Sequence, residues 1–345
     1  MRGARLLDTP DFFYDPATRP YKAGVRPFRA GTYRLEPDPN LIPHKFVVHN
    51  YGHGGAGITM SWGCADRVRE IVGAHGASGG VAVLGAGIIG LTAATLLRAL
   101  TPDVTVYAEK FTPDTTSDVA GGQWSPSLVR YDSANSAAEL AYFEILRRAR
   151  KAHERLGSGY GVWPRWNFTP RALTHLDKLP RDIVPKATRI NLPFAHLNRR
   201  GYKYCLLLVE VPILMRRLYQ ELHASGVPLV CKRFGSLDDI AGLPQRVVVN
   251  CTGLGARDLF NDRKMFAVKG QLVHLRPQSN LQYLFSGNGY VFPRTDAVIV
   301  GGTEECNVED NVPVDGTCEG LVRDAKALFA GTRFFARTPL LIQGK

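Results

Sequence analysis

The stretch Val81-Ala-Val-Leu-Gly-Ala-Gly-Ile-Ile-Gly-Leu-Thr-Ala-Ala-Thr-Leu-Leu-Arg-Ala-Leu100 decides the fold of this 345-residue chain. A short apolar run precedes three glycines, and apolar residues then recur at helical spacing, which predicts a strand, a tight turn and a helix. Gly85 permits the turn, Gly87 lets a pyrophosphate approach the backbone, and Gly90 lets the helix pack on the strand. The N–H groups of the first helical turn, which begins with Ile88 and Ile89, would donate to the phosphates.

A second predicted strand, Val104-Thr-Val-Tyr-Ala108, ends at an acidic residue. This residue, Glu109, lies about 20 residues after the glycine turn, where a carboxylate can accept hydrogen bonds from ribose hydroxyls. An acid suits a free 2′-hydroxyl better than the 2′-phosphate of NADP. The combination of strand, spacing and acid favours a dinucleotide site over a simple strand–helix connection, but it does not separate NAD from FAD.

The following segment, Phe111-Thr-Pro-Asp-Thr-Thr-Ser-Asp-Val-Ala-Gly-Gly-Gln-Trp124, strongly resembles the D-amino acid oxidase family. In that family the matching run holds FAD. Three other pieces match as well: Val249-Asn-Cys-Thr-Gly253, Val25-Arg-Pro-Phe-Arg29 with Arg34-Leu-Glu36 after it, and His49-Asn-Tyr-Gly-His-Gly-Gly-Ala-Gly-Ile-Thr59 with its Trp62-Gly-Cys-Ala65 tail. Beyond the glycine turn and its acid, the resemblance implies FAD contacts at Lys110, Thr116, Ser117, Gly122, Gln123, Gly54, Gly57, Ile58 and Thr59.

The order of these pieces departs from the family. There, the Arg-Pro segment and the histidine–glycine string close the chain, whereas here they precede the glycine turn. We therefore expect a circularly permuted chain, in which the small-residue run Gly73-Ala-His-Gly-Ala-Ser-Gly-Gly80 joins the former termini. Permutation is tolerated where termini lie close together at the surface. The alternative is a fusion product whose residues 1–75 belong to another copy, but the remainder would then lack a substrate arginine.

By the same resemblance, three residues act directly on the substrate. Arg26 would bind a carboxylate through its paired guanidinium donors, and Tyr290, in Gly289-Tyr-Val-Phe-Pro293, would add a hydroxyl to that clamp. The carbonyl of Gly55 would accept a hydrogen bond from the substrate amine. The N–H groups of residues 54–59, which lead into a helix over 62–72, would stabilise negative charge on a reduced flavin.

Some positions differ from the better-known oxidases. Gln123, Ser125 and Ser127 follow Gly122, and Ser286 stands where a lid tyrosine would be expected. These small or polar side chains predict a more open pocket, which leaves the identity of the substrate undecided. Arg29 and Arg34 are expected to form structural ion pairs.

The predicted fold is α/β, with a Rossmann-type FAD-binding domain and an antiparallel-sheet (α+β) substrate domain. The FAD-binding domain is expected at residues 43–127 and 233–260, and the substrate domain at 1–42, 128–232 and 261–345. Helical patterns cover Ser136 to Leu156 and Val211 to Ser225, and alternating runs at Gly270 to Leu275 and Ala297 to Gly301 predict antiparallel strands.

Composition excludes several other classes. With 45% hydrophobic residues the chain can bury a full core, and it has neither a long apolar run nor a signal-peptide pattern, so a cytoplasmic protein without a membrane partner is expected. The net charge of +12 comes without a recognised nucleic-acid module, which favours solvated basic faces. The six cysteines form no CxxC pair and are expected to be small buried side chains. His49 and His53 are expected to order a loop and to bind no metal.

The predicted activity is FAD-dependent oxidative deamination of a D-amino acid, or a related amine, by hydride transfer to flavin N5. The products would be an imino acid that hydrolyses to keto acid and ammonia, and H₂O₂ from O₂. A homo-oligomer is compatible with this activity. The alternatives are a glycine or secondary-amine oxidase, a dehydrogenase of the same fold, an NAD-binding Rossmann protein, and a flavin-binding relative without catalytic activity.

Overall fold

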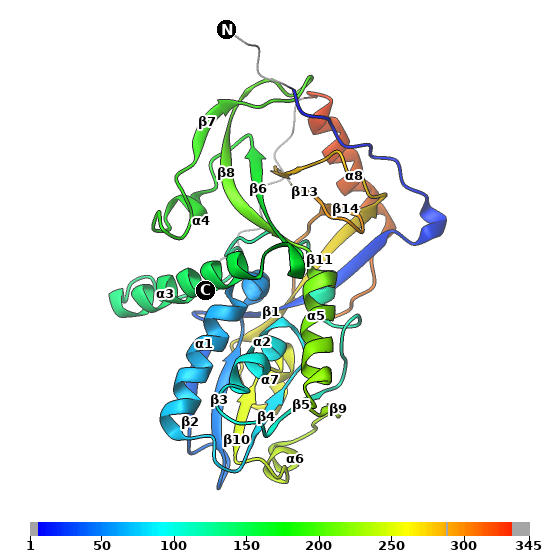
Figure 1. The fold of residues 1–345 in the computed structure, drawn as a ribbon. Helices are drawn as coiled ribbons and strands as arrows, with labels where there is room; N and C mark the ends of the chain where they lie inside the picture. The colour runs from blue at the N-terminus through cyan, green and yellow to red at the C-terminus, as the bar shows by residue number, and fades with distance from the viewer. Residues whose placement is uncertain (1–5, 288, 333–345) are drawn as a thin grey trace.

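The computed structural model describes residues 6–287 and 289–332, and these form two β-sheets with helices packed around them (Figure 1). The smaller sheet has six strands and is parallel except for β2, which runs antiparallel to β3. Its strands in spatial order are β2 (Arg34–Asp38), β3 (Phe46–Tyr51), β10 (Val247–Asn250), β4 (Val81–Leu84), β5 (Val104–Ala108) and β9 (Leu229–Cys231).

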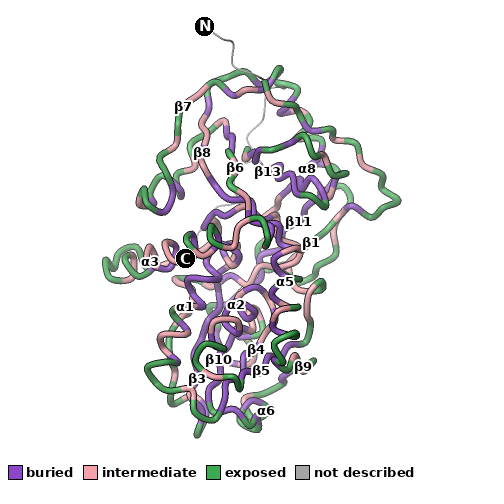
Figure 2. Tube along the Cα trace, in the orientation of Figure 1, coloured by how far each residue is buried: buried purple, intermediate pink, exposed green. Residues whose placement is uncertain are grey.

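Both faces of the six-stranded sheet are covered by helices, as its continuous apolar strands require. In β4, Val81 and Val83 face one hydrophobic cluster, and Ala82 and Leu84 face the opposite cluster. The first cluster includes side chains of α1 (Gly57–His75), α2 (Ile88–Leu97) and α5 (Val211–Ala224), whereas α6 (Leu237–Ala241) and α7 (Ala256–Leu259) contribute to the second. The strands between these layers are the buried centre of this half (Figure 2).

The larger sheet has nine strands and is antiparallel except for the β12–β6 pair. Strand β15 (Glu305–Cys306) pairs with β11 beside the main path. The strands along that path are β1 (Tyr21–Arg29), β11 (Met265–Leu275), β14 (Val298–Gly301), β13 (Tyr290–Pro293), β12 (Tyr283–Ser286), β6 (Val162–Thr169), β8 (Arg200–Val209) and β7 (Thr188–Asn191).

Alternation along these strands gives the larger sheet two different faces. Val273, Phe285 and Val291 pack under helix α8 (Asp315–Phe329), which closes one face. Leu272 and Phe292 point the other way and join the core of the six-stranded half. The face opposite α8 is therefore the one that meets the predicted dinucleotide site.

Residues 21–51 connect the two sheets. Strand β1 pairs with β11 over nine residues, from Tyr21 opposite Val273 to Arg29 opposite Met265. Strands β2 and β3 then enter the six-stranded sheet, where β3 pairs with β10. In a permuted chain we expect the first 40 residues to pack beside the last 15, but most of the latter lie outside the described part of the chain. Just before them, Phe329 contacts Phe12 with ring centroids 5.8 Å apart.

The predicted fold class is confirmed, and the two long helices appear at α3 (Ser136–Leu156) and α5, where the sequence patterns place them. The division into domains stays a prediction, but the sheets add one detail to it. Strands β2 and β9 belong to the six-stranded sheet, although they lie in the ranges expected for the substrate domain. Neither strand carries a sequence motif that would reveal its partner.

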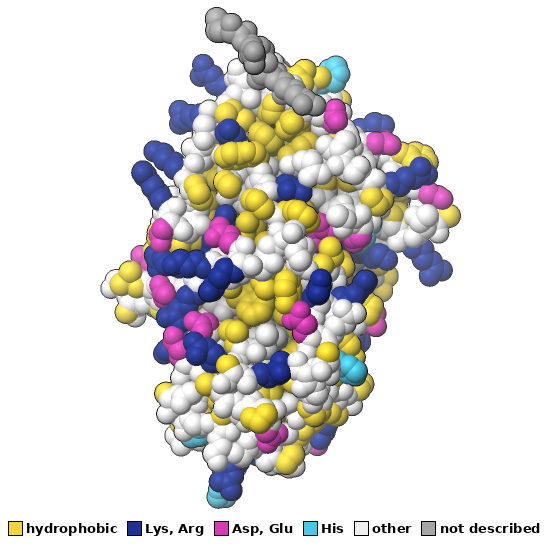
Figure 3. Space-filling model, in the orientation of Figure 1, with side chains coloured by type: hydrophobic (Ala, Val, Ile, Leu, Met, Phe, Trp, Pro, Cys, Tyr) yellow, Lys and Arg dark blue, Asp and Glu magenta, His cyan; other side chains and the backbone are white. Residues whose placement is uncertain are grey.

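The basic residues of α3 are mostly paired. Arg148 bridges to Asp66 and Glu70 of α1, and Arg150 is buried with its guanidinium 5.3 Å from the ring centroid of Trp124. Figure 3 shows many lysine and arginine side chains along the edge of the molecule, with acidic ones among them. Within residues 6–287 and 289–332, no helix is long and apolar enough to cross a membrane.

The expectation that all cysteines are buried is wrong. Cys64, Cys251 and Cys318 are buried, but Cys231 and Cys306 are exposed. The reason is their position: Cys231 ends the edge strand β9 and Cys306 ends the short strand β15, so neither thiol has a layer packed over it.

Candidate active site

Two helices begin side by side at the edge of the six-stranded sheet. A Cβ added to Gly57, the first residue of α1, would lie 3.9 Å from Cγ2 of Ile88, the first residue of α2. In neither helix does the N-cap residue cap the first turn through a side chain, and neither first turn contains an acidic residue. The Ile88 amide donates to Ser117 Oγ, but the other first-turn N–H groups and the positive dipole ends of both helices point to the same place, where an anionic group could be bound.

The glycine turn has the geometry expected of a dinucleotide site. Gly85 has a φ of +109°, which other residues rarely adopt, and a Cβ at Gly90 would lie 1.9 Å from the Gly85 carbonyl oxygen. Gly87 differs, because a Cβ there would meet only Ser117 Oγ, at 3.2 Å. A Cβ at Gly87 would therefore press only on this one hydroxyl, whereas the other two glycines are needed for the fold itself. The partly exposed Ile89 follows Ile88 in the first turn of α2.

The loop after β5 returns to the start of α2. Ser117 Oγ accepts a hydrogen bond of 3.0 Å from the Ile88 amide, and the neighbouring Thr116 is exposed in the 3₁₀ helix Thr116–Val119. Gly122 then pairs with β8, because its carbonyl accepts from the amide of Val209 at 2.6 Å. Glu109 and Lys110 are exposed at the end of β5, and no hydrogen bond of the Glu109 carboxylate to a described residue is present. That carboxylate is therefore open to ribose hydroxyls.

The histidine–glycine string lies against the end of this loop. The Gly55 amide donates to the carbonyl of Leu128 at 2.9 Å, and a Cβ at Gly54 would overlap the same oxygen. Thr59 Oγ1 exchanges two hydrogen bonds of 3.0 Å with the backbone of Ser125, and Ile58 packs in the core. In this structure Thr59 therefore anchors the loop through its hydroxyl.

Arg26 lies on the sheet face opposite α8. Its guanidinium covers Gly270, since a Cβ there would lie 2.3–2.5 Å from the guanidinium atoms. Nη1 donates to the carbonyl of Thr303 at 3.0 Å, and no ion pair joins Arg26 to a described acidic residue. The expectation for its neighbours is confirmed: Arg29 pairs with Asp262 at 2.7 Å, and Arg34 with Glu36 at 2.6 Å.

Tyr290 lies on the same face, next to Arg26. Its ring packs on Gly301 and Gly302, where added Cβ atoms would come within 2.5–3.3 Å of it, and on Gly121 of the loop after β5. Burial raises the pKa of Tyr290, while the positive charges of Arg26 and Arg294 act against that increase. The phenol is therefore a neutral hydrogen-bond donor. Segment 301–303 thus supports both members of the predicted carboxylate clamp, one through its glycines and one through the Thr303 carbonyl.

A polar cluster borders the clamp on the other side of Tyr290. Gln123 Nε2 donates to Asn167 Oδ1 at 3.0 Å, and Ser286 Oγ donates to the same oxygen at 2.9 Å. Ser286 pairs with Tyr290 across the strands, so the cluster continues along the same sheet face. Gln123 and Ser286 were expected near the pocket, but Asn167 was not, because β6 carries no motif.

Several other nearby residues have no sequence motif to identify them. His175 Nε2 lies 2.9 Å from Ser125 Oγ, and Arg294 forms an ion pair of 2.7 Å with Asp296. Glu304 follows Thr303 and is partly exposed. Glu304 lies next to Arg26 because strand β15, which follows Glu304, pairs with β11. The sequence alone does not show this pairing.

The buried histidines of the glycine string have structural environments. His53 Nε2 lies 3.4 Å from Cys64 Sγ, and its burial lowers its pKa to about 3. His49 Nδ1 lies 3.0 Å from Asn250 Nδ2. Among the described residues, no group of three His, Cys, Asp or Glu side chains is arranged to hold a metal ion.

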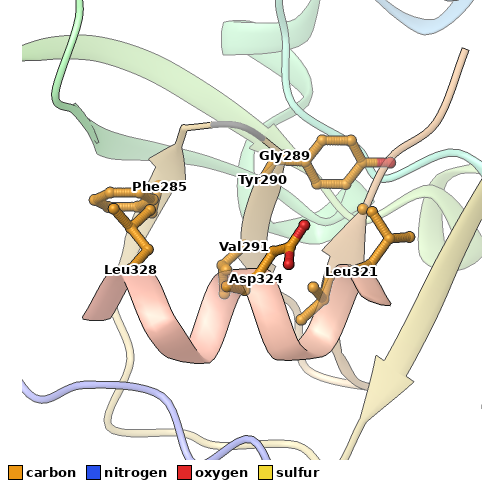
Figure 4. Close-up of a pocket in the computed structure, with 10 residues that line it drawn as sticks. Phe285, Gly289, Tyr290, Val291, Leu321, Asp324 and Leu328 are labelled. Carbon is orange, nitrogen blue, oxygen red and sulfur yellow. The ribbon is translucent and has the colours of Figure 1, made fainter. Parts of the chain in front are cut away.

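A small cavity lies on the other face of the sheet, under α8. Phe285 and Leu328 meet there, and Figure 4 shows the ring of Tyr290 projecting from its strand away from the helix. The cavity is lined mainly by apolar side chains, with Asp324 at its edge. The candidate site is therefore not this cavity but the opposite face, where Arg26 and Tyr290 lie.

A model of the FAD dependent oxidoreductase family, of the D-amino acid oxidase type, matches residues 80–340. The chain belongs to this family. It is thus an FAD-dependent oxidoreductase with a Rossmann-type fold, and the resemblance of residues 111–124 predicts this cofactor whereas the glycine turn predicts the fold alone. The match leaves out residues 1–79, which contain Arg26 and the histidine–glycine string.

Two oxidases and one solved structure are similar to most of this chain at low sequence identity. Human D-aspartate oxidase is 30% identical over 234 residues, which are 65% of this chain and 68% of that protein. The D-amino-acid oxidase of Rubrobacter xylanophilus is 27% identical over 261 residues, or 71% and 76% of the two chains. Among solved structures, glycine oxidase from Bacillus cereus superposes with a TM-score of 0.53 at 15% identity, covering 72% of this chain and 77% of that one. The last comparison supports the fold alone.

The first prediction concerns a side chain placed at Gly87. Gly87 has a φ of −69°, which valine can adopt, so Gly87→Val is expected to fold but to retain less than about a tenth of stoichiometric FAD, because the new side chain fills the pyrophosphate position. Purified protein would be assayed for flavin absorbance and for thermal unfolding. Gly90→Ala is the matched control: its Cβ would strike the Gly85 carbonyl, so the apoprotein should lose roughly 2 kcal/mol or more of stability. Stoichiometric flavin in folded Gly87→Val would contradict the assignment.

Proposed function

We propose that this protein is an FAD-dependent oxidase that deaminates D-amino acids, yielding an imino acid, then a keto acid and ammonia, with H₂O₂ from O₂. One observation carries the proposal. Arg26 and Tyr290, which are far apart in the sequence, lie together on one sheet face, and the Tyr290 ring touches Gly121 in the predicted FAD loop. A cation and a phenol side by side suit a substrate carboxylate.

The residues present fit FAD. The positive dipole ends of α1 and α2 suit a pyrophosphate, the lack of a side chain at Gly87 suits its close approach to the backbone, and the exposed carboxylate of Glu109 suits a ribose. The remaining contacts are proposed at Ile88, Ile89, Lys110, Thr116, Ser117, Gly122 and Gln123, and near the flavin ring at Gly54, Gly57, Ile58 and Thr59. When bound, FAD supplies a two-electron acceptor for the substrate and a route for those electrons to O₂.

The protein itself holds and orients the substrate. Arg26 presents paired N–H donors to the α-carboxylate, and Tyr290 donates its neutral hydroxyl to the same group. The Gly55 carbonyl, whose amide is fixed by Leu128, accepts from the substrate amine once that amine is neutral. No side chain is needed to remove a proton from the α-carbon, because the α-hydrogen leaves as a hydride. The protein therefore raises the rate mainly by holding the substrate in the reactive orientation.

We also propose that the chain is circularly permuted relative to its family. The family match begins at residue 80, whereas Arg26 and Gly55 lie before it. Strands β1 and β3 nevertheless pair with β11 and β10 from the C-terminal half over nine and four residues. Such integrated pairing favours one permuted enzyme over a fusion remnant, because a remnant would have no reason to complete both sheets.

The proposal is tested by turnover of enantiomeric pairs. The purified flavoprotein is expected to form H₂O₂ and a keto acid with D-amino acids and not with their L-enantiomers or with simple amines. The assay would compare D- and L-alanine, D- and L-norleucine, glycine, sarcosine and propylamine. Turnover restricted to glycine and sarcosine would favour a glycine oxidase, and equal turnover of propylamine would contradict the carboxylate clamp.

A further inference from the structure

We propose that Glu304 sets the charge selectivity of the site, so that the enzyme prefers amino acids with a cationic side chain and disfavours dicarboxylic ones. This inference rests on the proposed function and names its substrate class. It concerns a carboxylate that lies in the substrate region and has no partner there. The residues of the expected clamp do not include such a group.

The position of Glu304 follows from strand register. Strand β15 pairs Glu305 with Lys269 and Cys306 with Val268, so the residue before β15 comes next to Gly270, the glycine that Arg26 covers. The Arg26 guanidinium also bonds the carbonyl of Thr303, which immediately precedes Glu304. The substrate held by Arg26 would therefore lie beside Glu304.

The adjacent glutamate shows which way each side chain points. Glu305 accepts hydrogen bonds from Gln271 and from Thr303, and it is cross-strand neighbour to Lys269, whose ammonium is bonded to Asp310. These groups lie on the opposite face from Gly270 because neighbouring side chains of a strand alternate. Glu304, one residue earlier, is therefore on the Arg26 face.

Glu304 is an uncompensated charge. It is partly buried, and no hydrogen bond or ion pair joins its carboxylate to a residue within 6–287 or 289–332. Burial raises its pKa, and the positive charge of Arg26 opposes that rise. A cationic group on a bound ligand would stabilise such a carboxylate, whereas a second negative charge on the ligand would be repelled by it.

Nearby cations do not already neutralise Glu304. Arg294 is bonded to Asp296 and to the carbonyl of Ala120, and Arg26 would be occupied by the α-carboxylate of the substrate. An ammonium or guanidinium on the substrate side chain would then be the missing partner. A β- or γ-carboxylate would instead add a like charge at short range, where the effective dielectric is low. The site thus differs from what the name of the D-aspartate oxidase relative would suggest.

The test uses substrate pairs that match in shape and differ in charge. At about pH 8.5, roughly four units above the usual pKa of glutamate so that a raised pKa is still exceeded, kcat/KM would be measured for D-ornithine against D-norleucine and for D-aspartate against D-asparagine. The parent enzyme is expected to have a higher kcat/KM for D-ornithine than for D-norleucine, and a higher kcat/KM for D-asparagine than for D-aspartate. In Glu304→Gln, the preference for D-ornithine over D-norleucine should fall by about tenfold, and so should the preference for D-asparagine over D-aspartate. Glu305→Gln is the matched control and should leave both ratios unchanged.

A binding measurement gives a readout that does not depend on turnover. Calorimetric titration of the FAD-loaded protein with 6-aminohexanoate and with heptanoate compares a cationic tail with its neutral counterpart. The parent should bind 6-aminohexanoate about tenfold more tightly, and Glu304→Gln should lose that difference. This comparison in the parent decides the matter even where the variant does not fold.

The outcomes separate the two proposals. If D-norleucine is oxidised but the charge ratios are the same in the parent and in Glu304→Gln, the selectivity inference is overturned and the oxidase stands. Equal affinity of the parent for the two tailed ligands also overturns it. If no D-amino acid is oxidised, the proposed function fails, and the selectivity inference fails with it.

Discussion

Replacement of Arg26 by alanine is expected to lower kcat/KM for the best D-amino acid by roughly 30- to several-thousand-fold, while the flavin spectrum stays nearly unchanged. The reason is the loss of a bidentate charged partner in a partly desolvated site, which costs about 2–5 kcal/mol. Steady-state kinetics with the FAD-loaded variant would measure this. Arg26→Lys should recover only part of the loss, because an ammonium cannot reproduce the planar pair of donors.

Two further variants show whether the loss comes from the clamp. In Gly270→Ala the new Cβ would meet the guanidinium atoms at 2.3–2.5 Å, so Arg26 must move and the activity should fall although the arginine is still present. Arg29→Ala removes instead the ion pair with Asp262 and should lower thermal stability more than kcat/KM. An Arg26→Ala enzyme as efficient as the parent would mean that the substrate carboxylate binds elsewhere or is absent.

Deletion of residues 1–42 is expected to abolish turnover completely. The deleted part contains Arg26, β1 and β2. The nine-stranded sheet would lose β1, the partner of β11, and the six-stranded sheet would lose its edge strand β2. Turnover and flavin content of the shortened protein would be compared with those of the parent. The fusion-remnant hypothesis makes the opposite prediction, since it expects the remainder to act on its own.

A reordered chain is the control for this deletion. Placing residues 80–345 before residues 1–75 restores the order seen in the family while every strand keeps its partner. We expect flavin content equal to that of the parent and kcat/KM within about threefold, since permutation is tolerated when both orders allow the same packing. Loss of FAD binding in the reordered chain, with full binding in the parent, would contradict the permutation.

The sequence predicts the glycine turn because its determinants are local. A strand, three glycines at fixed spacing and a helix all lie within residues 81–97, and the structure bears out the steric roles of Gly85 and Gly90, while that of Gly87 stays a prediction. The long helices α3 and α5 were predicted for the same reason, since helical periodicity can be read from adjacent residues.

Features that depend on strand pairing could not be derived locally. Strands β2 and β9 join a sheet whose other strands come from other parts of the chain. The sequence of neither strand indicates which strand it pairs with. Glu304 is a similar case, because its closeness to Arg26 follows from the register between β11 and β15. The exposed thiols of Cys231 and Cys306 show that residue type alone does not determine burial at a strand end.

The clamp itself was predicted only through the family resemblance. Neither Arg26 nor Tyr290 lies in a pattern that demands catalysis, and they come together because β1 pairs with β11 and β13 with β14. The structure adds what the resemblance does not contain, namely the glycines at 270, 301 and 302 that leave room for the guanidinium and the phenol.

Anaerobic titration of the purified flavoprotein tests the central claim most directly. Under nitrogen, addition of one equivalent of a D-amino acid such as D-norleucine is expected to bleach the visible flavin bands, and admission of O₂ should restore them with release of H₂O₂. The L-enantiomer should leave the spectrum unbleached, and Arg26→Ala should need a far higher concentration of the D-enantiomer. A preparation that binds FAD fully but is bleached by neither enantiomer, nor by any member of the amino acid panel, would contradict the account.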